Sequence, residues 1–186
     1  LQKGIIIFKR KIDKSKKYVY FGDSKHASLL RELFVTYSHI KWDNILSGLG
    51  IEVLFQVLDY PEITFENLSK VTFWRYSRDF MALGIITFDE KGYSINPRFS
   101  ILANFLTEYQ KFLLNTLVRS ISESAVILWQ KDFECLVRVP KNSRIFQKNF
   151  LRTATSRLND FGIQIFSDFD IYFYSKKKSI RVEDVI

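Results

Sequence analysis

Hydrophobic positions at two different spacings divide the first part of the chain into strands and helices. Residues 4–8 and 16–21 are rich in Ile, Phe, Val and Tyr, which favour strands, so we predict a β-hairpin whose loop is the charged stretch between them. Apolar residues then recur every three or four positions in 25–39 and in 43–58, and Pro61 follows the second run. This spacing predicts two helices.

The pattern of apolar residues changes again after residue 62. A short helix is predicted at 65–70, and Val71–Thr72 is expected to break it. A second helix should follow, with an apolar face, a small residue on that face and a terminating glycine. Phe73, Phe80 and Leu83 form the apolar face, Ser77 is the small residue on it, and Gly84 is the terminating glycine.

A predicted hairpin follows, with strands at 85–88 and 93–95 around a turn at 89–92. The predicted order is helix, turn, helix, glycine and hairpin, and the sequence Leu-Gly-Ile-Ile-Thr-Phe starts at Leu83. Over residues 43–97 this combination resembles the winged helix-turn-helix of prokaryotic transcription regulators. The resemblance implies that the helix at 43–58 is a scaffold, that the helix after Thr72 is a recognition helix, and that the hairpin is a wing.

The longest helical pattern spans residues 98–121, where apolar residues recur at steps of three and four. A long apolar helix directly after a wing resembles the dimerisation helix of such regulators, which implies a homodimer with two heads on successive half-sites of DNA. The alternative is that the C-terminal segment covers this apolar stripe within one chain.

The C-terminal part changes character after residue 123. Strands are predicted at 125–129 and 133–139, then an amphipathic helix at 149–161, which Gly162 ends. A second pair of strands, 163–166 and 170–174, completes a small ββαββ domain. Its aromatic residues are expected to form either the floor of a ligand pocket or part of an aromatic core; they are Trp129, Phe166, Tyr172 and Tyr174.

The predicted fold class is therefore α+β, in four segments. Residues 1–40 hold the basic hairpin and a helix, 41–97 the winged helix, 98–122 the long connecting helix, and 123–186 the small domain. The order of these segments is similar to archaeal regulator-like proteins. It is also similar to winged-helix antitoxins that repress their own operon and pair with a nucleotidyltransferase toxin.

The positive charge of the chain is concentrated near its N-terminus. The 186 residues carry a net charge of +8, and residues 1–22 hold seven basic residues against one acidic residue, Asp13. We interpret this first hairpin as the wing of an incomplete first winged helix, since its Gly-Ile-Ile-Ile-Phe resembles the phrase at Gly84. A concentrated basic patch suits a polyanion such as DNA. Its candidate DNA contacts are Lys9, Arg10, Lys11, Lys14, Lys16 and Lys17.

The predicted recognition helix supplies a second set of candidates. Arg75 and Arg78 are three residues apart and lie on one helical face, from which an arginine can reach guanine or phosphate. Asp79 and the acidic turn residues of the hairpin oppose a phosphate backbone. The candidate DNA contacts of this module are Lys70, Thr72, Trp74, Arg75, Arg78 and Lys91.

Signals for enzymes, metals and cofactors are missing from the sequence. Cys135 is the only cysteine, and His26 and His39 are 13 residues apart without acidic or thiol ligands at useful spacing. There is no HExxH, no GxSxG and no Gly-Lys phosphate loop. No apolar run reaches 18 residues, and the apolar run near the N-terminus is too short for a signal peptide, so we expect a cytoplasmic protein.

These patterns favour a sequence-specific DNA-binding transcription regulator with duplex DNA as its partner and no catalytic residues. The alternative is a winged-helix module that binds another protein, as an antitoxin or assembly factor does, with little DNA affinity.

Overall fold

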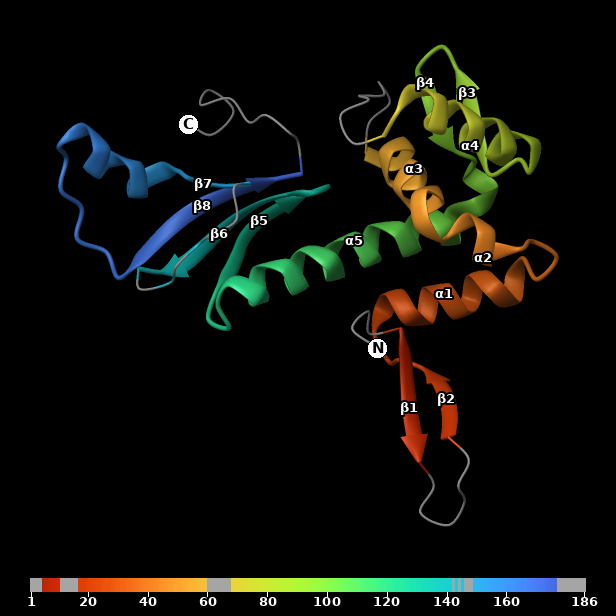
Figure 1. The fold of residues 1–186 in the computed structure, drawn as a ribbon, viewed down its shortest axis with the longest axis horizontal. Helices are drawn as coiled ribbons and strands as arrows, with labels where there is room; N and C mark the ends of the chain where they lie inside the picture. Colours follow the sequence, from red (N-terminus) through yellow and green to blue (C-terminus); the bar gives the residue numbers. More distant parts are fainter. Residues whose placement is uncertain are drawn as a thin grey trace. The chain divides into compact units, whose positions relative to one another are not determined.

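The structure is a computed structural model that describes residues 5–10, 17–59, 68–141, 143, 145 and 149–176, without the side chains of residues 6–10, 17–19, 154 and 159. It has an α+β fold and divides into two compact units, Leu1–Tyr109 and Gln110–Ile186 (Figure 1). The predicted fold class is confirmed at this level.

The first unit begins with the predicted antiparallel hairpin. Strands β1 (Ile6–Arg10) and β2 (Lys17–Phe21) pair in a register that places Arg10 opposite Lys17. The ring of Phe21 lies edge-on to Phe34, with 6.3 Å between the ring centroids. This contact joins the hairpin to α1 (Lys25–Thr36), the helix predicted at 25–39.

The helix predicted at 43–58 is interrupted. The structure has α2 (Trp42–Ile45) and α3 (Gly48–Asp59) instead, and Gly48 has a φ of +51°, in the left-handed region that a continuous helix does not contain. A Cβ added at Gly50 would lie 2.4 Å from the carbonyl oxygen of Ile45. The first glycine therefore permits the turn, and the second lets α3 start against the end of α2.

Helix α4 (Lys70–Ala82) starts earlier than predicted. Ser69 caps it, because the Ser69 hydroxyl accepts the backbone N–H of Thr72 at 3.1 Å. The predicted break at Val71–Thr72 is therefore wrong, since these residues form the first turn of α4. Half of the short helix predicted at 65–70 lies outside the described residues, and the described Leu68 and Ser69 are not helical.

The end of α4 agrees with the prediction, but one of its apolar residues does not. Gly84 ends the helix with a φ of +69°. Phe73, Ser77 and Phe80 are buried as expected, whereas Leu83 is 51% exposed. Leu83 is the residue after the last helical turn, where the chain already bends toward the following hairpin.

The second hairpin consists of β3 (Ile86–Asp89) and β4 (Gly92–Ile95), within one residue of the prediction. Asn96 closes its base, because its side-chain amide donates to the carbonyl of Gly84 at 2.8 Å and its backbone N–H donates to the carbonyl of Ile85 at 2.9 Å. Helix α3 contacts α4 and β4, and α4 contacts β3 (Figure 1).

The predicted long helix is α5 (Ser100–Ile121), preceded by the 3-10 turn η1 (Pro97–Phe99). The boundary between the two units falls inside this helix. Of the predicted stripe, Leu102, Phe105, Leu106 and Tyr109 are buried, whereas Phe112, Leu113 and Leu117 are half-buried. Tyr109 packs on His26 and Phe55 of the first unit, and homodimerisation through this helix stays a prediction.

The second unit contains a four-stranded antiparallel sheet in the order β5-β6-β8-β7. Its strands are β5 (Val126–Lys131), β6 (Glu134–Pro140), β7 (Phe150–Arg152) and β8 (Phe169–Ser175). The 3-10 segment η2 (Ala154–Phe161) lies between β7 and β8 in sequence, and Gly162 follows it with a φ of +80°.

The predicted ββαββ order is wrong in two places. The expected helix at 149–161 is a strand followed by a 3-10 segment, and 163–166 contains no strand. Phe150 and Leu151 fit a helical spacing, but they pair instead with Tyr174 and Phe173 of β8. Strand pairing to a neighbour that is distant in sequence overrides the local periodicity here.

Within the described residues, no helix is both long enough and apolar enough to cross a membrane.

Candidate nucleic-acid interface

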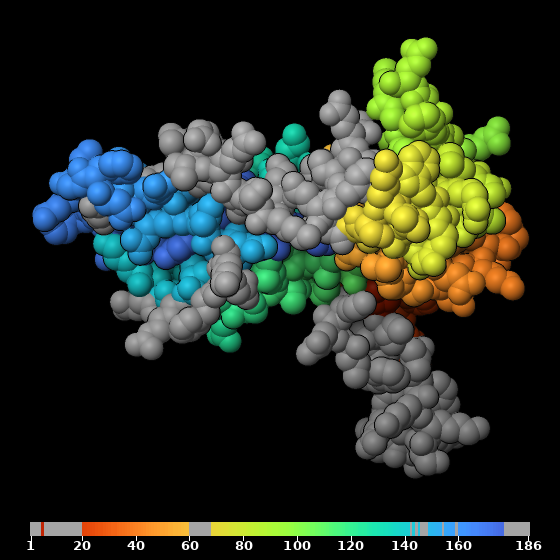
Figure 2. All heavy atoms as spheres, turned by 45° about the horizontal axis from the view of Figure 1, so that its top comes forward, coloured from red at the N-terminus to blue at the C-terminus, as the bar shows by residue number. Residues whose placement is uncertain are grey.

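The outer face of α4 carries a stripe of exposed side chains. Lys70, Trp74 and Arg78 follow at steps of four residues, so they lie on one side of the helix, each about 6 Å from the next along its axis. All three are exposed, and Trp74 is 50% exposed. In Figure 2, α4 lies at the surface of the first unit in yellow to yellow-green. The predicted contacts of this helix are therefore accessible.

Arg75 and Thr72, two further predicted contacts, differ in environment. Arg75 is exposed, and its guanidinium lies 5.3 Å from the ring centre of Tyr76. Thr72 is half-buried, and its hydroxyl lies 2.8 Å from that of Ser69. Thr72 thus belongs to the cap of α4, and the structure gives it a structural role that the sequence analysis missed.

An aromatic patch connects α4 to the second hairpin. Tyr93 of β4 is buried, and its ring centre lies 6.2 Å from that of Trp74 and 4.7 Å from that of Phe88, its partner across the hairpin. Phe88 is 63% exposed. Trp74, Phe88 and Tyr93 form what we call the aromatic patch, in which two exposed rings lean on one buried ring. Burial raises the pKa of the Tyr93 phenol, which keeps it neutral.

Sequence analysis included Trp74 but missed Phe88 and Tyr93. Their separation of five residues around a tight turn is the signal that was available, because it makes them cross-strand partners on one face of the hairpin. The contact between this face and Trp74 depends on how α4 packs on the hairpin, which the sequence pattern does not contain.

Charges around the aromatic patch are mixed, with a small excess of cations. The exposed Arg78 and Asp79 lie 3.6 Å apart, Nε to Oδ1, an exposed pair that contributes little to stability. At the hairpin turn, the Asp89 carboxylate accepts the backbone N–H of Lys91 at 2.8 Å, and the Lys91 side chain is exposed. Within the described part of the chain, Lys70 and Arg75 form no ion pair.

The basic residues of the first hairpin are described only in part. Lys9, Arg10 and Lys17 lie in β1 and β2, with Lys9 opposite Tyr18 and Arg10 opposite Lys17. Lys11, Lys14 and Lys16 lie outside the described residues. The hairpin that was predicted to carry the concentrated charge is present.

Among the described residues of the second unit, the four aromatic residues expected to floor a ligand pocket do not gather around one. Phe166 is 94% exposed, Trp129 is exposed on the edge strand β5, and Tyr174 packs on Phe150 at 4.8 Å between ring centres. These residues are separated because 163–166 does not form the strand that would have placed Phe166 in the sheet. The alternative prediction, that these residues belong to one aromatic core, is also wrong for Phe166 and Trp129, because both are exposed.

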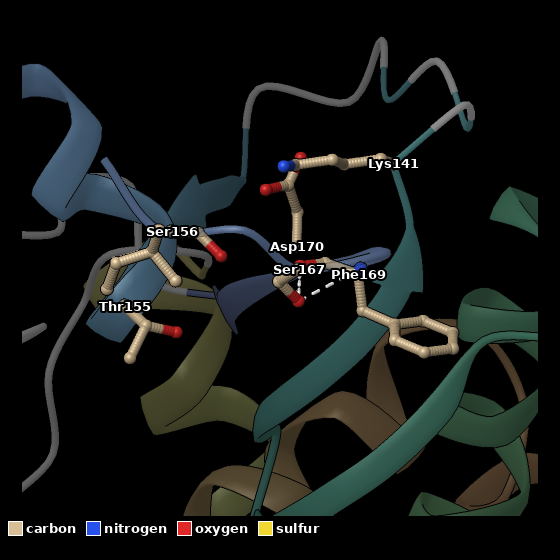
Figure 3. A pocket seen from close by; sticks show the side chains of 7 residues that line it. Lys141, Thr155, Ser156, Ser167, Phe169 and Asp170 are labelled. Atoms are coloured by element: carbon tan, nitrogen blue, oxygen red, sulfur yellow. Dashed lines mark hydrogen bonds between the residues drawn. The ribbon is translucent and has the colours of Figure 1, made fainter.

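A small polar cavity lies elsewhere in this unit. In Figure 3 the Lys141 and Asp170 side chains extend toward the same end of it. Asp170 is buried, and Arg152 Nη2 lies 3.7 Å from its carboxylate. The cavity volume is about 10 Å³, enough for one water molecule and too small for an effector. Its lining residues are Lys141, Thr155, Ser156, Ile165, Ser167, Phe169 and Asp170.

The two histidines have different surroundings. His26 is buried against Tyr109, with 5.7 Å between ring centres, whereas His39 is exposed. In the described ranges, no three His, Cys, Asp or Glu side chains are grouped to hold a metal ion.

The fold and the α4 face together define an α+β protein with an exposed helix-and-hairpin surface that combines cations and aromatic rings. No protein-family model matches the sequence, and neither the curated proteins nor the solved structures contain a significant match.

Proposed function

We propose that this protein is a DNA-binding transcription regulator whose first unit contains a winged helix-turn-helix. In this proposal α2 and α3 form the scaffold, α4 is the recognition helix, and β3 and β4 form the wing. The observation that supports it best is the exposed stripe of Lys70, Trp74 and Arg78 on α4, directly beside a hairpin. Helices of this size fit the major groove of duplex DNA.

Charge on the first hairpin supports the same proposal. Residues 1–22 hold seven basic residues against one acidic residue, and β1 and β2 pair as the predicted hairpin. A phosphate backbone suits such a concentration of positive charge. Arg75 and Arg78 then contact base edges or phosphates, and the hairpin adds phosphate contacts that carry no sequence information. The proposal does not depend on homodimerisation through α5.

A titration of fluorescently labelled duplex DNA, followed by anisotropy at several salt concentrations, tests the proposal. If four to six charges of the first hairpin neutralise phosphates, log K falls with log[salt] at a slope of roughly −4 to −5. The variant in which Lys9, Arg10, Lys11, Lys14, Lys16 and Lys17 are all replaced by Gln is expected to lose most of this slope.

A control variant neutralises three exposed basic residues of the second unit instead: Arg119→Gln, Lys131→Gln and Lys141→Gln. This control variant should keep the wild-type slope. Absence of any binding at low salt would exclude the proposed function.

A second candidate function is a protein-interaction module. Specific features of the same surface favour it: Val71 and Leu83 are exposed apolar residues at the two ends of α4, and the hairpin turn is acidic at Asp89 and Glu90. Co-purification with a stoichiometric protein, together with no DNA binding at low salt, would establish this function instead.

A further inference from the structure

We infer that the aromatic patch binds unpaired nucleic-acid bases, so that the preferred ligand is DNA with unstacked bases within or next to a duplex. The inference rests on the proposed function and narrows its ligand class. It starts from an arrangement that duplex recognition by cations does not require: two exposed rings, Trp74 and Phe88, supported by the buried ring of Tyr93.

The geometry suits stacking. Trp74 meets Tyr93 edge-on, at an interplanar angle of 79°, and Phe88 is tilted by 49° against the same ring. Each ring uses only part of its surface in this contact and leaves the rest to solvent. Exposed aromatic faces of this kind stack on any base, whereas bases inside a duplex are already stacked on their neighbours.

The basic residues beside the aromatic patch favour a nucleic acid over an apolar peptide as its ligand. Lys70 and Arg78 lie one helical turn on either side of Trp74. Cations that flank a stacking ring can bind the phosphates on both sides of the stacked base, as single-strand binding surfaces do. Lys70 has no ion pair among the described residues, and the Arg78–Asp79 pair is exposed and therefore weak.

The experiment compares how tightly the full chain binds two labelled DNA probes. One is a paired duplex of about 20 base pairs, two helical turns. The other is the same duplex with two unpaired thymines in the middle of one strand. The measured quantity is the ratio of Kd for the paired probe to Kd for the bulged probe, at one salt concentration. Stacking predicts a wild-type ratio of about 10, since one stacked base changes affinity by about 5- to 150-fold.

Variants separate stacking from charge. Trp74→Ala and Phe88→Ala should bring the ratio close to 1, and Trp74→Phe should restore part of it because a ring is present again. Arg75→Gln with Arg78→Gln should weaken binding of both probes and leave the ratio high. Val35→Ala is the control, because Val35 is an exposed apolar residue of α1 and lies outside the α4 surface. It should change neither Kd.

Quenching of tryptophan fluorescence gives a second readout. The bulged probe should quench the wild type more than the paired probe does, and Trp74→Phe should remove the difference. Trp42 is buried and Trp129 lies in the other unit, so Trp129→Phe should keep the difference.

The outcomes distinguish this inference from the proposed function. Equal affinity of the wild type for the two probes would overturn the inference and leave duplex binding intact. Failure to bind either probe would overturn both. Loss of a stoichiometric protein partner in Trp74→Ala and Phe88→Ala, with the ratio unchanged, would assign the aromatic patch to a protein and overturn the inference.

Discussion

At the scale of single residues, Ser77 shows how a sequence pattern identifies a position without explaining it. The pattern marks Ser77 as a small residue on the apolar face of α4, and the structure buries it completely. Its hydroxyl has no hydrogen-bond partner among the described residues. A buried hydroxyl without a partner loses its hydration and gains nothing in return.

We therefore expect Ser77→Ala to raise the free energy of unfolding by about 1 kcal/mol, because it removes the unsatisfied hydroxyl and keeps the small size. Urea unfolding followed by circular dichroism measures this change. Ser94→Ala is the control: Ser94 is exposed, and its hydroxyl lies 3.0 Å from that of Thr87, so its replacement should not stabilise the protein. Destabilisation by Ser77→Ala would mean that the hydroxyl has a partner.

At the scale of secondary-structure elements, helix caps decide where α4 starts. Two serines precede helices in this chain with similar extended backbone angles, Ser24 before α1 and Ser69 before α4. Only the Ser69 side chain accepts a backbone N–H of its helix; the Ser24 hydroxyl lies 3.3 Å from Nε2 of His26 instead.

Ser69→Ala should lower the free energy of unfolding by about 1 kcal/mol, the usual cost of removing a capping side chain. Ser24→Ala should cost less, because no cap hydrogen bond is lost. The two variants are compared by thermal unfolding under the same conditions. Equal costs would show that the Ser69 bond does not determine the start of α4. Since α4 carries the proposed interface, Ser69→Ala should also weaken DNA binding slightly.

At the scale of the whole molecule, the stability of the second unit can be followed through its buried cysteine. Cys135 is buried in the sheet of the second unit, and burial raises the pKa of its thiol from 9.0 to about 12. In the unfolded chain the thiol ionises near pH 9. The unfolded state therefore loses its proton at lower pH than the folded state does.

It follows that the contribution of Cys135 to stability is complete below pH 9 and decreases as the pH rises toward 12. Cys135→Val, which packs similarly and does not titrate, should make stability less dependent on pH in this range. Unfolding monitored between pH 8 and pH 11, with pH 7 as the reference, measures the difference.

At pH 8 the folded protein should react with a thiol reagent only as fast as this unit opens. Rapid reaction of the native protein would contradict this burial.

Local patterns predicted most of the elements. The hairpins, α1, the end of α4 and α5 follow from apolar spacing and from glycines such as Gly84. The split between α2 and α3 is local as well, since it depends on Gly48 and Gly50, whereas the strand at Phe150 depends on pairing with the distant β8. For the candidate interface, spacing located the exposed cations on α4 but did not place Phe88 beside Trp74.

The sequence by itself determined the α+β class, the concentration of positive charge in the first hairpin and the residues on the outer face of α4, because these depend on order and spacing alone. Tertiary structure decided that Leu102, Phe105 and Leu106 of α5 are buried, that residues 149–161 contain a strand, and that Trp74 and Phe88 share Tyr93 as a support. Each of these requires two distant segments to meet, and their contacts depend on the packing of the whole unit.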